Sequence, residues 1–176
     1  MGVVDLSEAK QDVNEAYNYL WDSVKEVIGN LTKPLDDIVK ELSKGINLYS
    51  NAELWDFQVR LGIESYTLGN LKEQSSLKEA CAEAFYKEGV AKSYIDAEGT
   101  QESKKQKSIL DTIDKQAVSM LWTSVSSLLK TKCDEAHRLV NIIQSIQISR
   151  ASEAKQIGNA RSEANAIDFN PIGNEE

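Results

Sequence analysis

The chain has 176 residues, the size of one ordinary domain, and 41% of them are hydrophobic against 27% charged, a balance typical of folded proteins. Only nine glycines and two prolines, Pro34 and Pro171, supply turn residues, which argues against a β-sandwich or barrel and predicts an all-α fold. The formal net charge is −8, yet residues 101–155 carry nine bases and six acids. This acidic average argues against coating duplex DNA by charge alone, while the basic segment allows a local patch that contacts phosphate.

Few residues are available for catalytic or metal chemistry. A single histidine, His137, and two cysteines, Cys81 and Cys133, exclude Cys/His zinc sites and two-histidine metal sites within one chain. The letters DEAH at 134–137 lack the phosphate-binding G-x-x-x-x-G-K-[ST] loop that accompanies a helicase box, so we interpret them as coincidence, with His137 an exposed helix residue. We therefore expect no catalytic residues, no metal and no cofactor. No apolar run approaches about 20 residues and the first residues are acidic, which predicts a cytosolic chain with no membrane segment and reduced cysteines.

Two helices are predicted in the first quarter of the chain. Apolar residues at helical spacing begin at Val13 and end at Gly29-Asn30, which predicts a first helix and an N-terminal unit over residues 1–32. Pro34 follows a cap and suits the first turn of a second, shorter helix that ends at Gly45. The main helical unit is expected to span residues 33–157.

A third, longer helix is predicted to begin at a Ser50 or Asn51 cap and to run past Tyr94. Three glycines inside it weaken it by about 1 kcal/mol each relative to alanine without breaking it. They are Gly62, Gly69 and Gly89.

The final third of the chain predicts one very long helix. From Thr100 to Ile157 there is no glycine or proline, and a helix covering most of that span is about 70 to 80 Å long. Its apolar residues recur at spacings of three and four with one stutter near Lys132, the pattern of coiled coils. Such a rod must pack on the third helix, on other subunits, or on both. The wide apolar surface between Leu139 and Ile148 favours self-association.

Beyond the long helix the composition changes. Residues 158–176 are acidic and poor in apolar side chains, which predicts a largely disordered tail. An alternative interpretation is that the run Asp168-Phe169-Asn170-Pro171-Ile172 is a short motif that docks a partner.

Lysines and tyrosines gather around Gly99. If the third helix and the long helix form a hairpin at this glycine, both sets of side chains meet at one end of the molecule. Cations for phosphate and rings for base stacking are the combination used in sequence-tolerant binding of single strands, and a solvated lysine-rich loop is the alternative. The predicted nucleic-acid-binding residues are Lys87, Lys92, Tyr94, Lys104, Lys105 and Lys107, with Tyr86 beside them.

Three blocks of sequence resemble, in the same order, segments of a known family. The first is LDDIVKELSKGINLYSNAELW, at Leu35, Asp37, Leu42, Lys44 and Ser50. The second is Ser75-Ser76-Leu77-Lys78 followed by Val90-Ala91. The third runs without a gap from Trp122 through Asp134, Ile143, Ile146, Gln147, Arg150, Ala151 and Glu153-Ala154. Across most of residues 35–154 the chain resembles the UvsY recombination mediators of T-even-type bacteriophages.

The resemblance implies a helical, ring-forming homo-oligomer that binds single-stranded DNA. It further implies that the protein helps a RecA-like recombinase load onto strand covered by single-strand-binding protein, in the host cytoplasm if the chain is phage-encoded. The family assembles largely through its C-terminal helix, which would place Leu139, Ile143, Ile146 and Arg150 in the assembly surface. The sequence departs from the family in its added N-terminal helix, its acidic tail, and Ser93 and Ile95, which stand where more positive charge is expected.

A second hypothesis belongs to another class of protein. The chain would then be a helical oligomeric adaptor or structural protein that engages other proteins through its acidic surface and does not contact DNA. Binding of oligo-dT at low salt separates the two hypotheses.

Overall fold

The computed structural model describes the chain from Val13 to Ile167; residues 1–12 and 168–176, including the expected docking motif at 168–172, lie outside the described part. Within that part every regular element is a helix, and the all-α prediction is confirmed. The elements are α1 (Val13–Leu42), the short 3-10 helix η1 (Ile46–Leu48), α2 (Asn51–Asp96), α3 (Gln101–Leu110) and α4 (Ile113–Ile167). None of these helices is both long enough and apolar enough to cross a bilayer.

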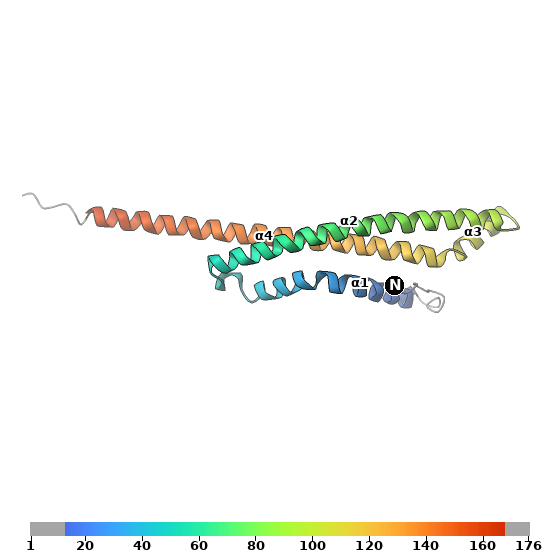
Figure 1. Cartoon of the computed structure of the whole chain (residues 1–176), viewed down its shortest axis with the longest axis horizontal. Helices are drawn as coiled ribbons and strands as arrows, with labels where there is room; N and C mark the ends of the chain where they lie inside the picture. The colour runs from blue at the N-terminus through green and yellow to red at the C-terminus, as the bar shows by residue number, and fades with distance from the viewer. Residues whose placement is uncertain (1–12, 168–176) are drawn as a thin grey trace, which may run out of the picture.

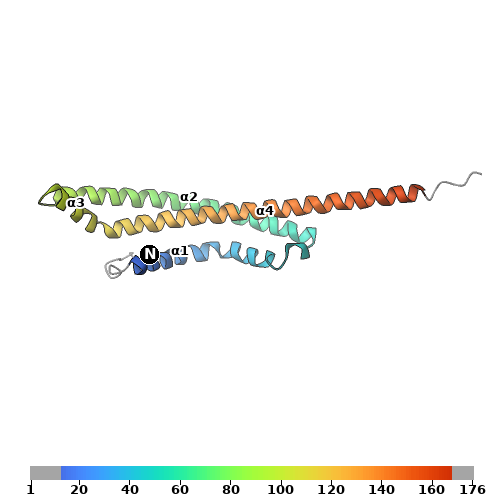
Figure 2. The ribbon, with the colours of Figure 1, turned by 180° about the vertical axis from the view of Figure 1, so that it is seen from behind.

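The molecule is an elongated helical hairpin with a third helix along part of its length. α2 and α4 lie side by side and run in opposite directions, while α3 folds back at the far end between them (Figure 1). α1 lies against this pair, and α4 continues well past the start of α2 (Figure 2). The expected long hairpin with a long C-terminal helix is therefore confirmed.

The core between α2 and α4 follows a seven-residue repeat. Leu54, Leu61 and Leu68 of α2 are all fully buried, and seven-residue steps place them on one face of the helix. The facing residues of α4, also fully buried, repeat at the same interval: Leu129, Ala136 and Ile143. The facing stripe of the long helix is thus covered within one chain by α2, one of the partners that the sequence left open, while Ile142 and Ile148 of α4 remain exposed.

α1 is one continuous helix, so the predicted break at Gly29-Asn30 is wrong. Pro34 lies inside it, where the missing backbone hydrogen bond costs about 3 kcal/mol. Leu35 and Ile38 are buried on the α2–α4 pair immediately after the proline, and each such side chain gains about 1.5–3 kcal/mol. Burial therefore outweighs the proline penalty, and the expected division between residues 32 and 33 falls inside a helix.

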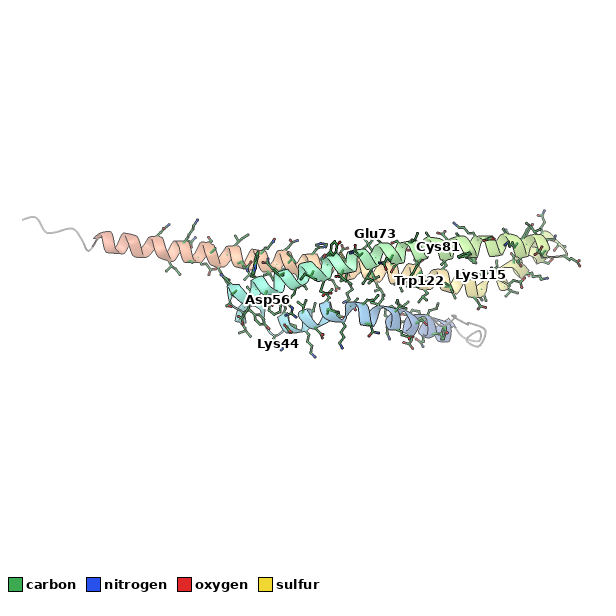
Figure 3. The ribbon with its side chains drawn as sticks, viewed as in Figure 1. Lys44, Asp56, Glu73, Cys81, Lys115 and Trp122 are labelled. Atoms are coloured by element: carbon green, nitrogen blue, oxygen red, sulfur yellow. The ribbon has the colours of Figure 1, made fainter. Side chains whose placement is uncertain are left out.

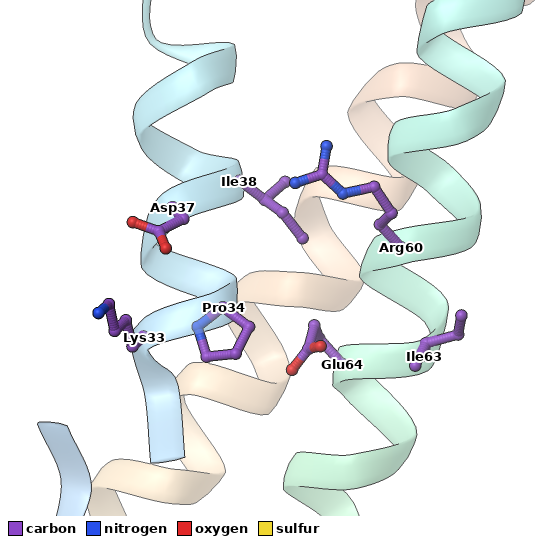
Figure 4. Close-up of a pocket in the computed structure, with 7 residues that line it drawn as sticks. All are labelled: Lys33, Pro34, Asp37, Ile38, Arg60, Ile63 and Glu64. Atoms are coloured by element: carbon purple, nitrogen blue, oxygen red, sulfur yellow. The ribbon is translucent and has the colours of Figure 1, made fainter. Parts of the chain in front are cut away.

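Two cross-helix ion pairs hold α1 in place. Lys132 Nζ of α4 lies 3.0 Å from Asp36 Oδ1, and Arg60 Nη1 of α2 lies 3.1 Å from Glu41 Oε2. Partial burial opposes the charge on Lys132, but hydrogen bonds to Asp36 and Glu135 more than offset it and raise the pKa of the lysine. Between α1 and α2 remains an open groove of about 340 Å³, shown in Figure 4, where charges of both signs face it: Lys33, Asp37, Arg60 and Glu64.

The long C-terminal helix differs from the prediction at both its start and its end. α3 and α4 are separate, because the chain leaves the helix at Asp111 and re-enters it at Ile113. Thr112 is buried there, and its hydroxyl donates to the Ser108 carbonyl at 2.7 Å, which satisfies a helix-end acceptor. At the other end α4 continues to Ile167, so the prediction that helix gives way to tail at Gly158 is wrong.

A capping box starts α2, and of the two expected caps, Ser50 and Asn51, the structure uses Ser50. The Ser50 backbone N–H donates to Glu53 Oε2 at 2.7 Å, and the Glu53 N–H donates to Ser50 Oγ at 3.3 Å. The hydrogen bonds from Ser50 lower the pKa of Glu53, so the carboxylate stabilises the fold above its unfolded-state pKa and loses this effect as the pH falls through the lowered value. We expect Glu53→Gln to lower the thermal midpoint at pH 7 and the difference from wild type to shrink toward pH 3. Circular dichroism melts measure this, with Glu26→Gln as the charge-matched control; a difference that does not change with pH would contradict the assignment.

Candidate nucleic-acid interface

The turn at Gly99 builds the end of the molecule that the sequence singled out. α2 ends at Asp96, and Gly99 adopts φ +110°, a conformation that favours glycine, which lets the chain reverse. Thr100 then caps α3, its hydroxyl accepting from the Ser103 N–H at 3.3 Å. The predicted hairpin about Gly99 is confirmed, and we call the region formed by residues 83–115 the hairpin tip.

A second glycine lets the return helix lie close to α2. A Cβ added to the buried Gly89 would lie 2.8 Å from Lys115 Nζ and 3.2 Å from Thr112 Cγ2. The junction between α3 and α4 therefore passes directly over this glycine. A further contact fixes α3 from the side, where the Ser93 hydroxyl donates to Asp111 Oδ2 at 2.6 Å.

The predicted binding residues divide between two grooves of the tip. The first groove, of about 600 Å³, contains Lys87, Tyr94 and Lys105, and adds Tyr86. Its remaining lining residues are apolar or small: Val90, Ala91, Ile95 and Ser108. It therefore presents two cations and two aromatic rings with no carboxylate among its lining residues.

The second groove, of about 290 Å³, is mixed in charge. It contains Lys92 and Lys107 and adds Lys115, but Asp96 and Asp111 line it as well. The two aspartates offset two of the three lysines, so this groove is the weaker anion site. The expected residue Lys104 is half-buried and lines neither groove.

Two of the expected lysines already have acidic neighbours. Lys87 Nζ lies 2.6 Å from Glu83 Oε1, and Lys92 Nζ lies 2.6 Å from Glu88 Oε1. The hydrogen bond and charge of Glu88 raise the pKa of Lys92, which keeps that lysine protonated. Because all four side chains are exposed, these pairs are weak and a phosphate can compete for either lysine.

Sequence reasoning found the tip but missed two of its residues. Lys115 enters the second groove only because α4 begins at Ile113, and no glycine or proline marks that start. The sequence predicts only that Gly89 weakens the helix, whereas in the structure this glycine makes room for the junction between α3 and α4. The positions of the glycines in the sequence do not indicate that Gly89 contacts Thr112 and Lys115.

The expected assembly residues of α4 face inward within one chain. Ile143 is fully buried against α2, and Leu139 and Ile146 are partly buried against the same core. Arg150 ends this stretch and donates to the Tyr49 carbonyl at 2.8 Å and to the Asn47 carbonyl at 3.2 Å. These four residues therefore hold the hairpin together, whatever further role they have.

Ser65 of α2 and Cys133 and His137 of α4 form a small cluster of polar side chains between the two helices. His137 is exposed, as expected, and its Nε2 lies 2.9 Å from the Ser65 hydroxyl. Cys133 Sγ lies 3.9 Å from His137 Nδ1 and 3.7 Å from the Ser65 carbonyl oxygen, both within hydrogen-bonding reach of a sulfur atom. Within residues 13–167, no three His, Cys, Asp or Glu side chains are close enough to hold a metal ion.

Comparisons of the chain with protein-family profiles, with curated proteins and with solved structures find no match.

Proposed function

We propose that this protein binds single-stranded DNA at its hairpin tip and acts as a non-enzymatic recombination mediator. In this role it would help a RecA-like recombinase load onto strand covered by single-strand-binding protein. The observation that carries the proposal is the first groove, in which Lys87, Lys105, Tyr86 and Tyr94 line one surface without a carboxylate. The proposal that the recombinase and the single-strand-binding protein are partners is supported by the sequence resemblance alone.

The chemistry of the first groove suits a flexible strand. Base–aromatic stacking contributes about 1–3 kcal/mol per base and tolerates any sequence, while lysines track the phosphates. A groove open to solvent on the side of a rod admits a single strand, whereas the acidic average of the chain disfavours the denser charge of duplex DNA. Two lysines per chain give weak binding, so repetition in a homo-oligomer would supply affinity through high effective concentration.

The second candidate function is a helical adaptor that binds only proteins. The pairing of Lys87 with Glu83 and of Lys92 with Glu88 favours it, because these acids reduce the positive charge that a strand would meet.

Fluorescence anisotropy of labelled oligo-dT tests the proposal. If two lysines per chain neutralise phosphates, raising the salt from about 50 to 200 mM should weaken binding about sevenfold. The double variant Lys87→Gln/Lys105→Gln should bind more weakly and show a flatter salt dependence, and Tyr94→Ala should lose about tenfold in affinity. The matched control is Lys40→Gln/Lys44→Gln, two exposed lysines at the end of α1, far from the tip; Figure 3 labels Lys44.

Two results would reject the DNA-binding proposal. One is the absence of oligo-dT binding at low salt, which would leave the adaptor candidate. The other is an equal loss of affinity in the tip variant and in the control, which would mean that general charge and not the first groove holds the strand.

A further inference from the structure

α2 carries a second apolar face that the rest of the described chain leaves largely exposed, with only Ile63 at the edge of the groove next to α1. Trp55 and Tyr66 expose 65% and 75% of their surface, and Val59 and Ile63 are exposed between them. At 100° per residue these four side chains fall within an arc of roughly 80°, on the side of the helix away from Leu54, Leu61 and Leu68. We call these four residues the outer stripe. A helix that is apolar on two opposite faces is typical of a helix buried on both.

Two glycines accompany the outer stripe without serving the fold of one chain. Gly62 and Gly69 lie on the same side of α2, and a Cβ added to either would meet no atom within 4 Å. Each glycine costs about 1 kcal/mol relative to alanine inside a helix. Neither has positive φ, so no turn requires them. At an exposed helix position, a glycine leaves room for another helix to approach closely.

The spacing of the outer stripe and the glycines is self-complementary. Trp55, Gly62 and Gly69 are seven residues apart, which places all three along one line of the helix. Two α2 helices laid antiparallel with their Gly62 residues in contact would set each Trp55 ring over Gly69 of the partner subunit. Val59 would lie next to Tyr66 of the partner subunit. The contact between a tryptophan and a glycine then occurs twice, once from each copy, as the two-fold symmetry of such an interface requires.

We propose that two copies of this chain pair through the outer stripe of α2, antiparallel and centred on Gly62. The stripe contains no charged residue, and among its charged neighbours Arg60 lies 3.9 Å from Asp56 and 3.1 Å from Glu41 of α1. Without a cation, the outer stripe cannot pair with a phosphate or an acidic peptide. It can pack against the identical apolar surface of a second copy. This pairing is independent of DNA binding at the tip, and it places the interface on α2 and not on α4.

The size of the surface predicts a concentration-dependent dimer. An aromatic side chain buries about 150–250 Å² when it is covered, so the stripe offers on the order of 500 Å² per copy. The total of about 1,000 Å² lies at the lower end for specific interfaces. Leu77, exposed further along α2, extends the apolar face.

Substitution of Gly62 shows whether this glycine serves the proposed interface or the fold of a single chain. Gly62→Leu fills open space in one chain and improves helix propensity, so the thermal midpoint of the protomer should hold or rise. The added side chain should block pairing, so that sedimentation at high protein concentration gives two chains for wild type and one for the variant. Gly29→Leu is the matched control, because Gly29 is also an exposed helical glycine with open space around it, and it should leave the dimer unchanged. A wild type that stays monomeric at every concentration, or a Gly62→Leu protein with unchanged mass, would overturn the proposal.

Cysteine cross-linking tests the antiparallel direction. In a Cys81→Ser background, oxidation of a mixture of Ala52→Cys and Glu73→Cys chains should link one variant to the other, because these positions lie within one residue of direct opposition across the proposed axis. Each variant alone should remain uncross-linked. Efficient linkage of Ala52→Cys to itself would show parallel pairing and reject the arrangement.

Discussion

Ile143→Ala is expected to lower the free energy of unfolding by about 2–5 kcal/mol, because removal of a fully buried branched side chain loses both burial and packing. Ile143 has no exposed surface and closes the core between α4 and α2, where Leu54 and Leu61 lie in the same cluster. Urea denaturation followed by circular dichroism measures the change. The neighbouring Ile142→Ala is the matched control, because Ile142 is 48% exposed and its truncation should cost less than about 1 kcal/mol.

The same pair of variants distinguishes an inward from an outward role of this surface. If Ile143 holds the hairpin together, Ile143→Ala should change stability while the mass under native conditions stays as in wild type. A variant that kept full stability but formed a smaller oligomer would contradict the inward packing. It would return the assembly surface to α4, as the resemblance to the mediator family implies.

Arg150→Ala is expected to lower the free energy of unfolding by about 1.5–3 kcal/mol, the range for hydrogen bonds to a charged group. The guanidinium donates to the carbonyls of Tyr49 and Asn47 and to Asn51 Oδ1 at 3.2 Å. These three bonds tie the loop between α1 and α2 to α4 at the point where α4 leaves the hairpin. Arg150→Lys should recover only part of the loss, because one ammonium group cannot reproduce the planar fork of donors.

Hydrogen exchange locates the effect of Arg150. Opening of the η1 loop should increase exchange in residues 46–50 of Arg150→Ala and leave the hairpin tip protected as in wild type. Arg138→Ala, at an exposed position of the same helix, controls for the loss of one positive charge and should change neither stability nor exchange. Equal destabilisation by both variants would show that charge, and not the fork, is what matters.

The two proposals together describe a two-ended molecule. About 32 residues of helix separate Gly62 from Tyr94, which is about 48 Å at 1.5 Å per residue. Antiparallel pairing centred on Gly62 would therefore put the two tips at opposite ends, about 95 Å apart. Two weak sites at that distance favour a strand long enough to reach both, and a shorter strand would gain nothing from the second site.

Local sequence signals were enough to predict the helical class, to place the turn at Gly99 and to narrow the cap of α2 to Ser50 or Asn51. Gly99 is needed where φ is positive, and Ser50 with Glu53 forms the box that begins α2. These features depend on the conformation of a few neighbouring residues, so their signals are local. The apolar spacing of three and four on α4 likewise indicates a face that must be buried, because periodicity records burial whatever the partner is.

The tertiary structure alone decided which partner each face has. Periodicity does not say whether Ile143 is covered by α2 or by another chain, and only the packed hairpin shows that α2 covers it. Pro34 stays inside α1, and Lys115 joins the tip, because burial and close helix contact outweigh local preference at those positions. The amino-acid sequence by itself determined that the chain forms helices with apolar faces that need covering. Contacts between residues far apart in the chain determined which were covered and left the outer stripe of α2 exposed.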